Sequence, residues 1–184
     1  MALGDDDDVR HLPHDVAIEL MELPHALRLT VADIPARVPY LHVDVPPRTP
    51  DGTRHLGLVW AAGDWAPERT MHFRDVRPLF ALPGITWHVL QRGPALAQCD
   101  ATWRPRDASD DVLATARTLR TLDGLVTVDS MPLHLAGALG VPATVLLPEP
   151  ADWRWMTGTR TPWYPTHELL RQRTPGDWRG VVRA

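Results

Sequence analysis

The sequence contains no lysine, and all 19 of its positive side chains are arginines. Chemistry that needs a lysine amine, such as Schiff-base formation, is therefore excluded. The single cysteine, Cys99, excludes an intramolecular disulfide and a cysteine-rich zinc site. No apolar run approaches the roughly 18 residues that suggest a membrane span, and the first residues, "MALGDDDDVRHLPHD", lack the pattern of a secretory signal. We therefore expect a soluble, cytoplasmic protein.

Net positive charge is also lacking. The formal net charge is -4, whereas proteins that bind nucleic acids or membrane surfaces usually carry a basic patch, so neither partner is expected. The length of 184 residues is most simply one domain, and a hydrophobic content of 44% is enough to build a core. His11 and His14 lie near an acidic run, but no third ligand follows at a metal-binding spacing, and we expect no metal.

What the sequence does contain divides it into two regions. Residues 1–50 are interrupted by prolines that preclude long regular elements. Residues 51–184 alternate apolar runs with amphipathic stretches, which predicts an α/β fold: a Rossmann-like parallel sheet with helices on both faces. The predicted strands are His55–Trp60, Gly84–Leu90, Gly124–Asp129, Pro142–Pro148 and His167–Gln172. The predicted helices are Arg74–Leu82, Asp110 to about Leu119, Met131–Leu139 and a terminal helix from Gly176.

Ligands of open parallel sheets bind outside the carboxyl ends of the strands. Three junctions lie there: "VWAAGDW" (Val59–Trp65), "LQRGP" (Leu90–Pro94) and "VDSMPLH" (Val128–His134). We expect these loops to lie side by side above the sheet.

The third junction has the most specific chemistry. A helix that starts at Ser130 directs free N–H groups and its positive dipole end toward the crevice, where a phosphate is favoured. Ser130 can donate to a phosphate oxygen, and His134, one turn later, can reach the same anion. Asp129 would repel a phosphate and is better suited to sugar hydroxyls or to ordering nearby N–H groups. Helix capping by Asp129 or Ser130 explains the same pattern equally well.

The other two junctions carry weaker signals. Gly63 allows a close approach of the backbone to a ligand, and Arg69 has the geometry to bind a diphosphate with two hydrogen bonds. Gln91 and Arg92 are placed to contact a nucleobase edge or a ribose. Each of these residue types is also common without any ligand.

The ordered set of motifs resembles a known family. The matching segments are "GLVWAAG" (Gly57–Gly63), Arg69-Thr70, "LPGITWHVLQRGPA" (Leu82–Ala95), "VTVDSMPLHLAGALGVPATVLLP" (Val126–Pro148), "DWRW" (Asp152–Trp155), "PWYP" (Pro162–Pro165), Arg171-Gln172 and "GDW" (Gly176–Trp178). They resemble the C-terminal half of bacterial glycosyltransferases related to the heptosyltransferase family, including versions fused to tetratricopeptide repeats. Met21–Leu41 resembles the crossover between the two domains of that family.

The resemblance implies a half of the GT-B architecture that binds a nucleotide-sugar donor without a metal. Asp129, Ser130 and His134 would lie at the sugar and diphosphate, Gln91 and Arg92 near the nucleoside, and Gly63 and Arg69 at the interdomain cleft. The sequence departs from the family at Arg92, where a lysine is common. From the resemblance we expect this sequence to lack the family's N-terminal domain, which supplies the acceptor site and the general base.

Three functions remain open at this point. The chain is the donor-binding half of a glycosyltransferase that acts with a partner or a second copy, contacted through residues 11–50. Alternatively, it is a non-catalytic relative that serves as an interaction or nucleotide-sensing module. A third alternative is another enzyme of nucleotide sugars, such as an epimerase or a hydrolase.

Overall fold

The structure of the chain is a computed structural model that describes residues 13–64, 66–100, 102 and 111–183. The chain divides into two compact units, residues 1–34 and residues 35–184. The second unit begins inside the Pro-rich region, so residues 35–50 belong with the sheet. His11 and Asp110, which the sequence analysis singled out, lie outside the described residues.

The first unit contains short helical turns. These are the 3₁₀ turn η2 (Leu20–Glu22), the helix α1 (Leu23–Ala26) and the 3₁₀ turn η3 (Val31–Asp33). None of the three elements contains a buried residue. Most of the large apolar side chains described in this unit are exposed, namely Val16, Ile18, Leu20, Met21, Leu27, Leu29 and Val31, whereas Leu23 and Ile34 are half-buried.

The second unit is built on five parallel strands: β1 (Arg54–Val59), β2 (Ile85–Val89), β3 (Gly124–Val128), β4 (Ala143–Leu147) and β5 (His167–Arg171). Their order is β2-β1-β3-β4-β5. The predicted α/β fold with a parallel sheet is confirmed. This order is that of a doubly wound sheet whose direction of winding reverses between β1 and β3.

The helices lie close to their predicted positions. They are α2 (Phe73–Val76), α3 (Val112–Arg120), α4 (Met131–Ala138) and α5 (Trp178–Arg183). The expected helix at Arg74–Leu82 is wrong in its length, because α2 ends at Val76 and continues as the 3₁₀ turn η5 (Arg77–Ala81). Pro78 explains the change, since it has no N–H to donate to the carbonyl four residues earlier. The other 3₁₀ turns of this unit are η4 (Pro67–Arg69), η6 (Pro94–Gln98) and η8 (Trp153–Trp155).

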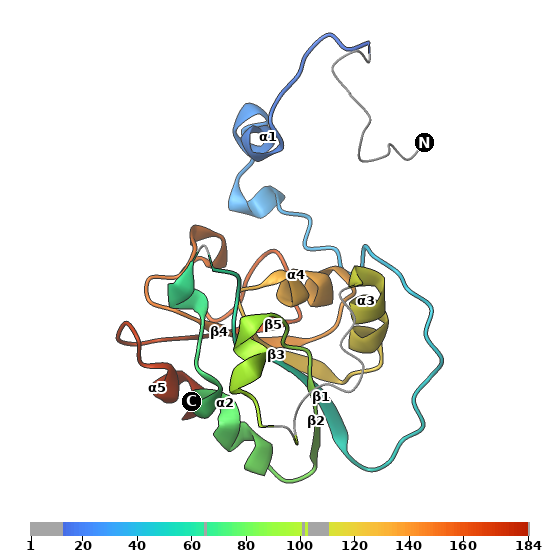
Figure 1. The fold of residues 1–184 in the computed structure, drawn as a ribbon. Helices are drawn as coiled ribbons and strands as arrows, with labels where there is room; N and C mark the ends of the chain where they lie inside the picture. Colours follow the sequence, from blue (N-terminus) through green and yellow to red (C-terminus); the bar gives the residue numbers. More distant parts are fainter. Residues whose placement is uncertain (1–12, 65, 101, 103–110, 184) are drawn as a thin grey trace. The chain divides into compact units, whose positions relative to one another are not determined.

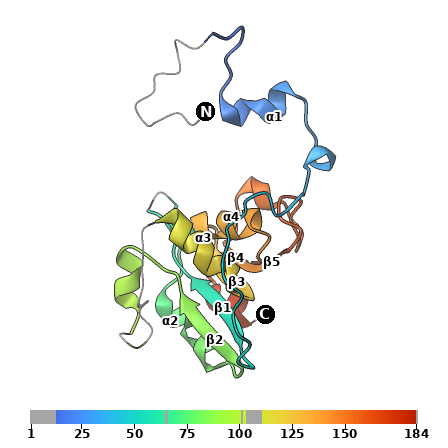
Figure 2. The same ribbon diagram turned by 90° about the vertical axis from the view of Figure 1, so that its right-hand side faces the viewer.

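Helices cover both faces of the sheet, α3 and α4 on one and α2 and α5 on the other (Figures 1 and 2). Alternate residues of each strand supply the two cores, because successive side chains point to opposite faces. In β1, Val59 packs with the α3–α4 side and Leu58 with the α2–α5 side.

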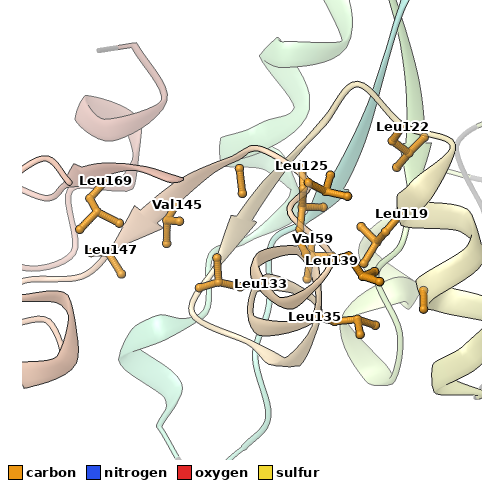
Figure 3. Packing of buried hydrophobic residues seen from close by; sticks show 14 of the residues in the cluster. Val59, Leu119, Leu122, Leu125, Leu133, Leu135, Leu139, Val145, Leu147 and Leu169 are labelled. Atoms are coloured by element: carbon orange, nitrogen blue, oxygen red, sulfur yellow. The ribbon is translucent and has the colours of Figure 1, made fainter. Parts of the chain in front are cut away.

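The core under α3 and α4 is a leucine-rich cluster (Figure 3). Three leucines are almost completely buried against Leu125 of β3: Leu119 of α3, Leu133 of α4 and Leu139, which directly follows α4. Burial of each such leucine contributes roughly 2 kcal/mol. This packing fixes the start of α4 above the carboxyl end of β3. No helix described in the structure is long and apolar enough to cross a bilayer.

Candidate functional site

Arg69 and Asp129 meet at the point where the winding of the sheet reverses. Arg69 lies in the connection that follows β1, and Asp129 directly follows β3, the neighbouring strand. The Nη1 atom of Arg69 is 3.5 Å from Oδ2 of Asp129. In doubly wound sheets this position, outside the carboxyl ends of the strands, is where ligands bind.

Asp129 is only 1% exposed. It is the centre of a group of side chains, called here the Asp129 cluster, that also contains Arg69, His134, Trp155, Tyr164 and Tyr40. The indole N–H of Trp155 donates to its Oδ2 atom at 3.0 Å. On the other side, Nε2 of His134 lies 3.5 Å from Oδ1. Three groups from three different segments therefore surround one buried carboxylate: the connection after β1, the helix α4 and the 3₁₀ turn η8.

The electrostatic balance keeps this carboxylate ionised. Burial raises the pKa of Asp129, but the hydrogen bonds from His134 and Trp155 and the charges of His134 and Arg69 lower it by more. The net pKa lies below the ordinary value for an aspartate. Asp129 is thus a fixed negative charge that orients its neighbours, and it faces them rather than solvent.

His134 is held by contacts on both ring nitrogens. Its Nδ1 atom is 3.1 Å from the hydroxyl of Tyr164, opposite to the nitrogen that faces Asp129. The ring also stacks on Trp155, with centroids 5.6 Å apart and planes inclined by 22°. The side chain of His134 remains 39% exposed. An anion bound here would meet the exposed edge of a ring whose orientation is already fixed.

Tyr164 reaches His134 because α4 carries a glycine at the contact. A Cβ atom added to Gly137 would lie 2.2 Å from Cδ1 of Tyr164, which is far inside any permitted separation. The hydroxyl of Tyr164 also hydrogen-bonds to Tyr40, and the pKa of Tyr164 is raised by burial and by that hydrogen bond. Tyr40 is itself anchored by its N–H, which donates to the carbonyl of Ala138 at 2.9 Å.

Ser130 stands at the N-cap position of α4, but its side chain points back to the strand. Its hydroxyl donates to the carbonyl of Val128 at 3.2 Å and lies 3.3 Å from the hydroxyl of Thr127. Within the described chain no side-chain capping bond starts α4, so the capping interpretation of Asp129 and Ser130 is wrong. The N–H of Leu133 donates to the carbonyl of Ser130 at 3.1 Å, so a backbone group rather than a capping side chain accepts it at the start of α4.

The loop that carries Arg69 is closed at its base. The N–H of Met71 donates to the carbonyl of Trp60 at 2.8 Å, and the N–H of Ala62 donates to Thr70 Oγ1 at 3.1 Å. Gly63 lies exposed within this loop, and a Cβ atom built on it meets nothing within 4 Å. Among the described residues, therefore, no neighbour requires a glycine at this position.

Gln91 and Arg92 are directed elsewhere. Gln91 is 4% exposed, and its Oε1 atom accepts hydrogen bonds from the N–H groups of Trp60 and Ala61 at 2.9 and 2.8 Å. Arg92 donates to Thr115 Oγ1 on α3 at 3.1 Å. Gln91 thus joins the ends of β1 and β2, and Arg92 contacts α3.

Three residues of the cluster were not predicted as site residues. Trp155 and Tyr164 lie in "DWRW" and "PWYP", segments that carried the family resemblance but had no assigned role. Tyr40 lies in the Pro-rich region. The tryptophans late in the chain were the available signal, but the packing of aromatic residues produces the same composition.

Among the described residues, no group of three or more His, Cys, Asp or Glu side chains is arranged to hold a metal ion. Comparison of the chain with protein-family models, with curated proteins and with solved structures found no match. The site geometry is therefore the basis for the proposal below.

Proposed function

We propose that this chain binds a nucleotide sugar at the Asp129 cluster, as the donor-binding half of a GT-B glycosyltransferase would. The observation that carries the proposal is the contact between Arg69 and Asp129 at the reversal of the sheet, beside the start of α4. It supports the resemblance to the heptosyltransferase-related family, whose donor site would use the same residues.

Each group has a distinct part in such a site. Arg69 offers a guanidinium that suits a diphosphate, and the first N–H groups of α4 add a second anion-binding element. Asp129 does not contact the phosphates; it holds Arg69, His134 and Trp155 in position. Because these positions are set before the ligand arrives, less conformational entropy is lost on binding.

A non-catalytic role as a nucleotide-sensing module is the second candidate. The observation that favours it is the state of Asp129, a buried carboxylate with a lowered pKa and donors on both oxygens. Such a group is poorly suited to remove a proton from an acceptor hydroxyl. Sugar transfer would then depend on a base from a partner or a second copy, which residues 11–50 are proposed to contact.

Calorimetric titration with ADP, UDP, GDP and the corresponding nucleotide sugars tests the first proposal. We expect measurable binding of one nucleotide class, at least tenfold weaker in Arg69→Ala and in Asp129→Asn. Arg120→Ala is the matched control. Arg120 is an exposed arginine at the end of α3, and it lies at the amino ends of the strands because β3 begins shortly after it. Circular dichroism of each variant verifies that it is folded.

The outcomes separate the candidates. No binding at millimolar nucleotide would remove the proposed function. Equal affinities in the wild type and in Arg69→Ala would move the site elsewhere. Binding without release of free nucleotide in the presence of a partner chain or sugar acceptors would favour the sensing role.

A further inference from the structure

A second histidine–carboxylate arrangement lies at the amino end of the sheet. Nε2 of His55, on β1, is 2.8 Å from Oδ2 of Asp51. Its Nδ1 atom is 2.9 Å from Nε2 of His88, on the adjacent strand β2. The two rings have centroids 5.0 Å apart. Asp51, His55 and His88 therefore form one continuous hydrogen-bonded chain.

The donors and acceptors determine how many protons this row of three side chains holds. The pKa of Asp51 is lowered far below its ordinary value, first by the backbone N–H of Thr53 and then by His55, so its carboxylate only accepts. Nε2 of His55 must then carry a proton, and in the neutral ring Nδ1 has only a lone pair. That lone pair accepts the Nε2–H of His88.

One additional proton fits this chain. It binds to Nδ1 of His55, which then donates to His88 after the proton of His88 moves to its other nitrogen. The resulting imidazolium of His55 faces Asp51 and is stabilised by it. A second proton has no such place, because it would leave two N–H groups and two positive charges facing each other across 2.9 Å.

The charged groups around the pair come from two segments. Arg48 and Asp51 belong to the connecting segment, and Asp123 precedes β3. Nη2 of Arg48 is 2.8 Å from Oδ2 of Asp123, which also accepts the backbone N–H of His55 at 2.7 Å. Burial, followed by the charges of His55 and Arg48, lowers the pKa of His88. The surroundings therefore oppose the second proton as well.

We propose that Asp51, His55 and His88 form a pH-sensitive latch between β1 and β2 that accepts one proton and opens on the second. β2 is an edge strand of the sheet, so repulsion between the two imidazolium rings is relieved by local separation of the strands. The opening is confined to the amino end. At the carboxyl end, the buried amide of Gln91 joins β2 to the backbone of Trp60.

Two backbone amides in the same molecule report on the two ends of this ladder. The N–H of Arg54 donates to the carbonyl of Gly84 at the amino end, at 2.9 Å. The N–H of Leu90 donates to the carbonyl of Leu58 at the carboxyl end, at 3.0 Å. Hydrogen exchange of both, corrected for intrinsic rates, is measured by NMR between pH 8 and pH 4.5. We expect exchange at Arg54 to accelerate at least tenfold relative to Leu90 as the pH falls.

The imidazole nitrogens give an independent readout. Long-range ¹H–¹⁵N spectra distinguish the tautomers of His55 and His88 and follow the protonation of each. We expect both rings in the Nε2–H form at pH 8 and two separate protonation steps, with the second step coinciding with the faster exchange at Arg54. A single step shared by both rings, or independent titration of each at its ordinary pKa, would overturn the proposal.

His88→Gln keeps a hydrogen-bond donor but cannot be protonated, so the acceleration at Arg54 should disappear. His72→Gln, at an exposed histidine just before α2, is the matched control and should behave as the wild type. Persistence of the effect in His88→Gln would contradict the latch. Equal acceleration at Arg54 and Leu90 in the wild type would assign the effect to global unfolding, and would also contradict it.

Discussion

Two histidine–carboxylate pairs lie at opposite ends of the strands of the same sheet, and they differ in what surrounds them. Asp129 is buried, and its pair with His134 is completed by a guanidinium and an indole N–H. The side chain of Asp51 is 50% exposed, and the other ring nitrogen of His55 faces a second imidazole. The same two residue types therefore give a buried carboxylate held by three groups at the carboxyl ends of the strands, and a more exposed hydrogen-bonded row of one carboxylate and two imidazoles at the amino ends.

Removal of the buried carboxylate should have the largest effect. Asp129→Ala leaves the guanidinium of Arg69 and the indole N–H of Trp155 without their buried acceptor, and the free energy of unfolding should fall by about 3–5 kcal/mol. Asp129→Asn, which keeps an oxygen for Trp155, should lose less. Urea denaturation at pH 7 measures both. A loss from Asp129→Ala no greater than that from Asp51→Ala would remove the distinction between the two ends of the strands.

A further histidine, His167, shows the effect of burial on the pKa without a carboxylate partner. His167 is fully buried, and burial, opposed in part by a hydrogen bond to the carbonyl of Leu133, lowers its pKa to about 4. Between its ordinary pKa of 6.5 and about 4, the unfolded chain binds a proton that the folded chain does not. Stability should therefore be full above pH 6.5 and fall by about 3 kcal/mol as the pH drops to 4.

This pH dependence is measured by denaturation midpoints between pH 7.5 and 4. It should be largely absent in His167→Asn, even if that variant is less stable at pH 7. A profile unchanged by the substitution would show that other groups carry the effect. The stability that Asp129 contributes is lost at lower pH than that of His167, because the ordinary pKa of an aspartate is about 4 and the pKa of Asp129 lies below it. This contribution is present above about pH 4 and is lost as the pH falls further.

A smaller effect is expected at Gly137. Gly137→Ala forces the ring of Tyr164 away from α4 and should cost about 1–3 kcal/mol, the usual range for overpacking. The hydrogen bond between Tyr164 and His134 would be lost with it, so nucleotide affinity should also fall. Ala136→Gly, at a buried neighbour on the same helix, is the control: a loss of stability without a loss of affinity there would show that the contact with Tyr164 is specific.

The smallest effect on stability at pH 7 is expected for Asp51→Asn. Asp51 is exposed, so its ion pair with His55 is screened by solvent. The shift in the denaturation midpoint should be smaller than for any variant above, whereas the first protonation step of the His55–His88 pair should move to lower pH. NMR titration checks the second point, and an unchanged step would mean that Asp51 does not hold the proton on His55.

The sheet could be predicted because its signal is local. β3 and β4 are apolar runs flanked by turn residues, and the structure places them within a residue or two of the predicted ranges. The length of α2 could not be predicted from hydrophobic spacing, because Pro78 interrupts a pattern that is otherwise helical.

The cluster around Asp129 was predicted in part. Asp129, Arg69 and His134 follow from the rule that ligands bind at the carboxyl ends of parallel strands, and the structure brings these three together. Gln91 obeys the same rule by position, yet its amide is occupied by the backbone of Trp60 and Ala61. A sequence pattern predicts where a strand ends, but it does not predict which group the side chain at that position hydrogen-bonds.

The sequence by itself determined the alternation of strands and helices, the acid and hydroxyl after β3, and the absence of lysine and disulfide chemistry. Only the tertiary structure decided that Asp129 is buried between Arg69, His134 and Trp155, and that His55 lies against His88. The reason is physical. Hydrophobic periodicity is encoded by neighbours in the chain, whereas the charge state of a side chain depends on groups that approach it only when distant segments pack together.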